Sequence, residues 1–134
     1  MIVVDSNVLA YLYLPGEFSQ QAEALLRQHP QWHAPPLWRS ELRNILSGYV
    51  RRQQLSLADA IQIQQEAQAL MALGEQAVDS AAVLALAQQS GCTAYDCEFV
   101  ALAQALGCPL MTQDKQVLRA FPGVAYSLCS VKGA

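Results

Sequence analysis

YDCEFVALAQALGCPLMTQD, residues 95–114, places a helical pattern, a strand pattern and three carboxylates in immediate succession. Apolar residues recur at helical spacing from Phe99 to Leu106, and Gly107 is a typical helix terminator. The apolar run that follows, residues 108–111, predicts a buried strand. A helix that leads directly into a buried strand is typical of α/β proteins, in which strands lie side by side between layers of helices.

The same alternation continues through the rest of the chain. Apolar runs predict further short strands at residues 1–4, 32–34, 76–78 and 124–126. Periodicity, capping residues and Gly or Pro breaks predict helices at residues 8–14, 17–28, 37–53, 56–73, 80–89 and 115–121. We therefore expect an α/β sandwich of helices around a mainly parallel sheet. Because repeats, low-complexity tracts and linkers are absent, we expect one domain over residues 1–134.

Composition narrows the classes of protein that fit. The chain has a net charge of −3, with 8 Lys and Arg against 11 Asp and Glu. That balance argues against tight, unaided nucleic-acid binding, but less against an enzyme whose acidic site is neutralised by metal ions. No apolar run is long enough to cross a membrane, and the amino terminus does not resemble a signal peptide. The four cysteines lack CxxC spacing, which favours unpaired thiols in a reducing cytoplasm.

Four carboxylates are candidates for chemistry, although each has an ordinary structural explanation when taken alone. Asp5 and Asp114 directly follow predicted strands, where a carboxylate often caps the next helix. Asp96 has the spacing of a capping box with Thr93. Glu41, expected in the first turn of its helix, would be favoured there by the helix dipole. None of the four is decisive by itself.

Taken together, the four carboxylates predict a metal site. Ligands of α/β proteins collect at the carboxyl ends of the strands, where Asp5 and Asp114 are expected, and the helix of Glu41 can cover that edge. Asp96 falls on the apolar face of its helix, where an isolated charge is costly. Converging carboxylates repel one another, and Mg²⁺ or Mn²⁺, which prefer oxygen ligands, would relieve that repulsion.

Such a cluster suits hydrolysis of a phosphodiester bond. We expect Asp5 and Asp96 to bind the metal directly, Asp114 to bind it directly or through water, and Glu41 to orient the attacking water. Polar neighbours are expected to hold these carboxylates in place by hydrogen bonds: Ser6, Asn7 and Thr112. Basic side chains on or near the site are candidates for contact with the substrate's phosphates, with a solvated helix face as the alternative: Arg39, Arg43 and Lys115.

Four motifs in this order resemble the PIN-domain ribonucleases, particularly the small VapC-like toxins of bacterial toxin–antitoxin pairs. The motifs are IVVDSNVL at residues 2–9, PLWRSELRNIL at 36–46, TAYDCEFVALA at 93–103 and GCPLMTQD at 107–114. The resemblance covers essentially the whole chain. Each motif is weak alone, but their order and spacing in a chain of this length make the match specific.

The resemblance implies a three-layer sandwich with about five parallel strands and Mg²⁺- or Mn²⁺-dependent cleavage of RNA, often tRNA. Asp5, Glu41, Asp96 and Asp114 match the family's acidic residues one by one. Homodimers and inhibition by a cognate antitoxin protein are also implied. The chain departs from some relatives at Lys115-Gln116, where they carry a further acidic residue, so the match supports a second metal less well than a first.

Three other interpretations remain open. A phosphoacceptor receiver domain also uses an early aspartate, but it needs an acidic pair where this chain has Asp5-Ser6-Asn7. A non-catalytic interaction module could keep the scaffold and bind a partner. A nuclease that processes RNA without a toxin role would have the same sequence features. The sequence specifies neither the RNA target nor the cleavage position.

Overall fold

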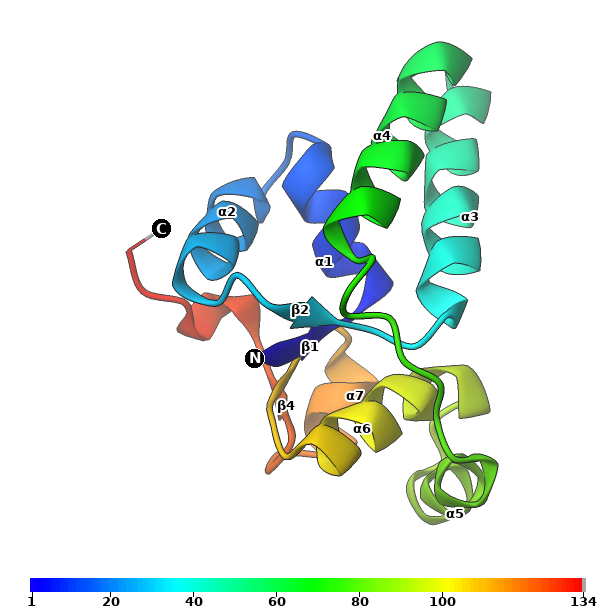
Figure 1. Cartoon of the computed structure of the whole chain (residues 1–134), viewed down its shortest axis with the longest axis vertical. Coiled ribbons are helices and arrows are strands. Elements are labelled where there is room, and N and C mark those ends of the chain that lie inside the picture. Colours follow the sequence, from blue (N-terminus) through cyan, green and yellow to red (C-terminus); the bar gives the residue numbers. More distant parts are fainter. Residues whose placement is uncertain (134) are drawn as a thin grey trace.

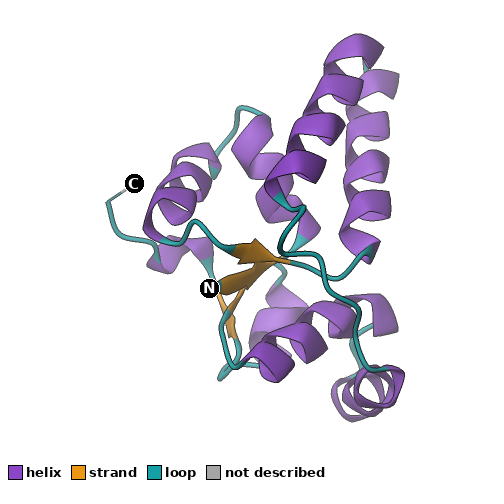
Figure 2. Cartoon of the chain, in the orientation of Figure 1, coloured by secondary structure: helices purple, strands orange, loops and turns teal. Residues whose placement is uncertain are grey.

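Four short parallel strands form the centre of the computed structural model, which describes residues 1–133 (Figure 2). The strands are β1 (Ile2–Val4), β2 (Trp32–His33), β3 (Leu110–Met111) and β4 (Ala125–Tyr126). Their order across the sheet is β2-β1-β3-β4, and each neighbouring pair is parallel. Parallel strands need crossover connections, and helices supply them here. The predicted α/β class is therefore confirmed.

Helices cover both faces of this sheet (Figure 1). In that view the first four helices lie above the strands and the other three below, and α3 and α4 form a long hairpin that extends away from the sheet. The helices are α1 (Ser6–Tyr13), α2 (Ser19–Gln28), α3 (Leu37–Arg51), α4 (Leu57–Leu70), α5 (Ser80–Ser90), α6 (Ala94–Leu106) and α7 (Lys115–Ala120). A 3₁₀ turn, η1 (Leu128–Ser130), packs against α2. The arrangement is the predicted three-layer sandwich.

Capping residues explain most helix boundaries. The side chains of Ser56, Asp79 and Thr93 each accept a hydrogen bond from the backbone N–H three residues later, at the starts of α4, α5 and α6. Gly91 and Gly107 end α5 and α6 in the left-handed conformation, which glycine adopts without steric cost. These local signals are visible in the sequence, and the predicted helices accordingly agree with the structure to within a few residues.

The fifth predicted strand, at residues 76–78, is wrong. Only an isolated parallel bridge between Ala34 and Glu75 forms there, with Ala34 N donating to Gly74 O (3.1 Å) and Gln76 N donating to Ala34 O (3.1 Å). The next hydrogen bond of a parallel ladder would require an N–H from Pro36, and proline has none. The sheet therefore has four strands within residues 1–133 rather than about five.

The core lies where the helical layers meet the sheet. All three residues of β1 are buried, and α6 packs on both β1 and β3; Phe99, Val100 and Ala103 of this helix are buried. The apolar side of α3 faces the core, since Trp38 and Leu42 are fully buried. Within residues 1–133, no helix is both long and apolar enough to cross a bilayer.

Candidate active site

A single open pocket of about 470 Å³ is lined by all four candidate carboxylates. Asp5 directly follows β1, and Asp114 lies three residues after the end of β3. These strands are parallel neighbours, so their carboxyl ends lie at the same edge of the sheet. Asp96 enters the pocket from the first turn of α6, and Glu41 from α3. The fold thus brings together four acidic side chains that are far apart in the sequence.

Thr112 connects two of these carboxylates. Its side chain is buried (1% exposed), and its hydroxyl donates a hydrogen bond to Oδ2 of Asp5. The hydroxyl oxygen of Thr112 in turn accepts the backbone N–H of Asp114 at 3.0 Å. Oδ1 of Asp5 accepts the backbone N–H of Val8 at 3.1 Å, so Asp5 also caps α1. The capping explanation of Asp5 is correct and coexists with its position in the pocket.

Glu41 is held by the start of α1. The hydroxyl of the buried Ser6 donates to Oε1 of Glu41 at 2.7 Å. The expectation that Glu41 lies in the first turn of its helix is wrong, because α3 begins at Leu37 and its first turn holds no acidic residue. The helix dipole acts mainly on the terminal turn and does not explain this glutamate. Its hydrogen bond to Ser6 is the contact that fixes it.

Asp114 and Asp96 also have capping contacts at helix starts. Oδ1 of Asp114 accepts the backbone N–H of Val117 at 3.0 Å and caps α7. At the start of α6, the hydroxyl of Thr93 accepts the backbone N–H of Asp96 at 3.0 Å. The ordinary structural roles considered from the sequence are therefore present. The contact at Asp114 holds its carboxylate, whereas the one at Asp96 engages its backbone N–H; both side chains line the pocket.

Burial and mutual repulsion raise the pKa of three of the carboxyls. Burial lifts the pKa of Asp5 from 3.8 to about 6, against the lowering effect of the Thr112 hydroxyl. Burial is the main cause that raises the pKa of Glu41, and the negative charges of Asp96 and, less, Glu98 raise it further. Burial and then Asp114 raise the pKa of Asp96. Within residues 1–133, no Lys or Arg is among the influences on these three pKa values, so the charge cluster lacks a cationic partner.

The predicted basic contacts lie outside the pocket lining. Nε of Arg39 lies 2.7 Å from Oε1 of Glu75, so its guanidinium is paired within the fold. Arg43 donates to the hydroxyl of Ser40 at 3.1 Å on the exposed side of α3. Lys115 is exposed at the first residue of α7.

The donor set of the pocket suits a hard divalent cation, because it consists of carboxylate, hydroxyl and amide oxygens. Within the described chain, no group of three acidic, histidine or cysteine side chains is already spaced to hold an ion jointly. Mg²⁺ does not need such a preformed cage, since it keeps several waters and is commonly bound through one or two carboxylates. The residues therefore fit a hydrated Mg²⁺ or Mn²⁺ ion better than a fully protein-coordinated one.

Several site residues were not predicted from the sequence. Ser40, Asn44 and Tyr95 line the pocket beside the expected Ser6 and Asn7. Asn44 lies three residues after Glu41, and that helical spacing is a signal that could have identified it. Tyr95 directly precedes Asp96, but its exposure depends on how the helices pack.

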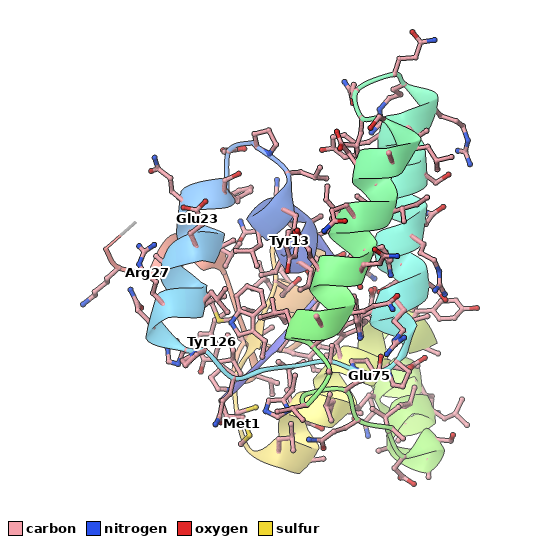
Figure 3. The ribbon with its side chains drawn as sticks, turned by 45° about the horizontal axis from the view of Figure 1, so that its top comes forward. Met1, Tyr13, Glu23, Arg27, Glu75 and Tyr126 are labelled. Atoms are coloured by element: carbon pink, nitrogen blue, oxygen red, sulfur yellow. The ribbon has the colours of Figure 1, made fainter. Side chains whose placement is uncertain are left out.

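Glu75 is a second omission. It holds the first turn of α3 by accepting hydrogen bonds from the indole N–H of Trp38 (2.9 Å) and from Arg39. Figure 3 places Glu75 where the segment after α4 passes the start of α3. No local sequence pattern indicates this contact.

Comparison with known proteins identifies the family to which this chain belongs. The sequence model of the PIN-domain family matches residues 2–123, and the chain therefore belongs to that family. Ribonuclease VapC3 of Pyrobaculum aerophilum is 34% identical to it over 129 residues, which cover 92% of this chain and 96% of that protein.

Solved structures share the fold. The crystal structure of PAE2754 from Pyrobaculum aerophilum superposes with a TM-score of 0.75 at 20% identity, covering 95% of this chain and 83% of that one. A toxin–antitoxin complex from Klebsiella pneumoniae contains a chain with a TM-score of 0.69 at 18% identity, covering 96% of this chain and 98% of that one.

Proposed function

We propose that this protein is a Mg²⁺- or Mn²⁺-dependent endoribonuclease that hydrolyses RNA phosphodiester bonds in the four-carboxylate pocket. The observation that carries the proposal is the convergence of Asp5, Glu41, Asp96 and Asp114, from four separate elements, on one open pocket. The raised pKa values of three of these carboxyls support it, because a divalent cation would relieve their repulsion. The ribonuclease activity named for the 34%-identical relative supports the choice of RNA.

Asp5, Asp96 and Asp114 are the proposed metal ligands. When bound, the ion would lower the pKa of a water molecule and offset the charge of the scissile phosphate. Thr112 keeps Asp5 and the backbone of Asp114 in fixed relation through its two hydrogen bonds. Asn7, at the start of α1, adds an amide to the same wall of the pocket.

Glu41 is the proposed residue that orients the attacking water. Its Oε1 accepts the hydroxyl of Ser6, which leaves the second carboxylate oxygen to accept a hydrogen bond from a water molecule in the pocket. Ser6 is buried and lies on the first turn of α1, so it holds Glu41 from a rigid element. Fixing the direction of the water lowers the entropic part of the barrier to in-line attack on phosphorus.

Contacts to the RNA backbone are proposed for Arg43 on α3 and Lys115 on α7, which are both exposed. Arg39 is a weaker candidate because its guanidinium is paired with Glu75. The net charge of −3 means that these few side chains would not give tight binding by themselves. Most of the affinity would then come from the metal site and from the pocket.

A toxin role with a cognate antitoxin partner, and a homodimeric state, complete the proposal. The toxin role is supported by the VapC name of the relative and by the toxin–antitoxin complex that shares the fold. Expression of the wild-type chain should arrest growth of a host that lacks the antitoxin, and the Asp96→Asn chain should not. A wild-type chain that cleaves RNA but leaves growth unaffected would support an RNA-processing role instead.

The decisive experiment is cleavage of labelled total RNA and tRNA by the pure protein with Mg²⁺, with Mn²⁺ and with EDTA. Asp96→Asn keeps the size of the side chain and removes a ligand charge, so we expect loss of cleavage. Asp59→Asn is a matched control on α4, because Asp59 is exposed and lies outside the pocket. Metal-independent cleavage, or equal activity of Asp96→Asn and wild type, would overturn the mechanism. Inactivity of the wild type on every RNA would favour a non-catalytic interaction module.

A further inference from the structure

An exposed aromatic ring borders the carboxylate pocket. Tyr95 lies in the first turn of α6 next to Asp96, lines the pocket, and is 63% exposed. Phe99, one turn later, lines the same pocket but is only 4% exposed, so it belongs to the core. The face of the Tyr95 ring is therefore available to a molecule that enters the pocket, and that of Phe99 is not.

The Tyr95 ring is not paired with another ring or a cation within the described chain. Within residues 1–133, aromatic and cation–π pairs involve Tyr11 with Phe18, Trp38 with Arg39, and Tyr49 with Arg52, but not Tyr95. A single exposed aromatic residue is common and often has no function. Tyr95 differs because it borders a pocket whose other exposed groups are carboxylates, hydroxyls and amides.

The electrostatics of the pocket limit how RNA could be held there. Among residues 1–133, no Lys or Arg lines it, so ion pairs with phosphates do not supply affinity inside the pocket. Stacking of a nucleobase on an aromatic side chain needs no positive charge, and every base offers a π-face. The amide of Asn44, one helical turn from Glu41 on α3, adds hydrogen-bonding groups suited to the edge of such a base.

We propose that Tyr95 stacks on the nucleobase adjacent to the scissile phosphate. The proposal rests on the proposed nuclease function, because it is the phosphate at Asp96 that brings this base to Tyr95. A base inside a duplex is already stacked on both faces and cannot lie on the ring without being unpaired and displaced. Loops and single-stranded segments meet that requirement directly.

The first test compares steady-state cleavage of a single-stranded RNA by wild type, Tyr95→Ala and Tyr95→Phe. We expect Tyr95→Ala to raise KM about tenfold, which corresponds to about 1.4 kcal/mol and lies within the usual worth of one stacked base. Phenylalanine keeps the ring and should restore KM to within about threefold of wild type. Tyr126→Ala removes an exposed ring (43%) outside the pocket and serves as the matched control with unchanged KM.

The second test measures binding without cleavage. In a Glu41→Gln background with Mg²⁺, fluorescence anisotropy of a labelled RNA would be compared between single strand and duplex of the same sequence. We expect tighter binding of the single strand, and loss of that preference when Tyr95→Ala is added. Equal binding with and without the Tyr95 ring, or no binding at all, would overturn the stacking proposal. The preference for the single strand could depend on the Tyr95 ring while the wild-type protein cleaves no RNA. That pair of results would support stacking and refute the proposed nuclease function.

Discussion

Thr112 and Asp5 are 107 residues apart in the sequence, and the hydroxyl of the first donates a hydrogen bond to the carboxylate of the second. The two residues meet because β1 and β3 are parallel neighbours whose carboxyl ends coincide. The same hydroxyl oxygen accepts the N–H of Asp114. One buried hydroxyl thus links the carboxylate of Asp5 to the backbone of Asp114.

Thr112→Val should impair the site while preserving the shape of the side chain. Valine has neither a donor for Asp5 nor an acceptor for the N–H of Asp114, so the carboxylate of Asp5 and the backbone of Asp114 each lose a hydrogen bond. We expect activity to fall about 10- to 100-fold, the usual effect of removing a group that orients a metal ligand. Thr112→Ser keeps the hydroxyl and should retain most activity. A Thr112→Val enzyme as active as Thr112→Ser would show that this hydrogen bond is dispensable.

The metal-free protein should become less stable as the pH rises from 4 to 7. Asp5 has a folded pKa of about 6, above its ordinary value of 3.8, so the folded state binds more protons than the unfolded state between these values. The free energy of unfolding therefore decreases with rising pH, by about 2 to 3 kcal/mol from Asp5. Denaturant unfolding in EDTA measures this decrease. Asp5→Asn should remove the contribution of Asp5 and leave the decrease due to Glu41 and Asp96, whose pKa values are also raised. An equally steep pH profile in that variant would refute the assignment.

Glu75→Ala should destabilise the fold from outside the pocket. It leaves the indole N–H of the fully buried Trp38 without its partner and also breaks the ion pair with Arg39. An unsatisfied buried donor costs about 1 to 3 kcal/mol, and denaturant unfolding should detect a loss of that size. Glu66→Ala, at an exposed position of α4, is the control and should change stability by less than about 0.5 kcal/mol. Equal stabilities of the two variants would contradict the role of Glu75.

Gly74→Ala should be severely destabilising because of a backbone contact. A Cβ at this position would lie 1.9 Å from the carbonyl oxygen of Trp32, and a backbone oxygen in β2 cannot move away without disturbing the strand. We expect a loss of about 3 kcal/mol or more, at the upper end of overpacking effects. Gly123→Ala is the control, since nothing lies within 4 Å of its added Cβ. Comparable melting temperatures for the two variants would rule out the predicted clash.

Local patterns in the sequence determine the element order and much of the candidate site. Capping signals at Ser56, Asp79 and Thr93 depend only on a side chain and a backbone N–H three residues away, so they can be recognised without the fold. Apolar runs predicted β1 and β3 and hence the positions of Asp5 and Asp114 just beyond them. Parallel strands end at a common edge, so the meeting of these two carboxylates was also predictable.

Long-range packing decided the rest, because it depends on backbone approaches that no local pattern encodes. The hydrogen bonds from Trp38 and Arg39 to Glu75 join segments more than 35 residues apart. They engage an arginine that the sequence suggested for contact with RNA. The strand expected at residues 76–78 is reduced to one bridge because Pro36, on the neighbouring segment, lacks the N–H that would extend the ladder. The exposure of Tyr95 likewise follows from how α6 packs on the sheet. Sequence alone therefore determined which residues cap, pack and carry charge, and tertiary structure decided which of them meet.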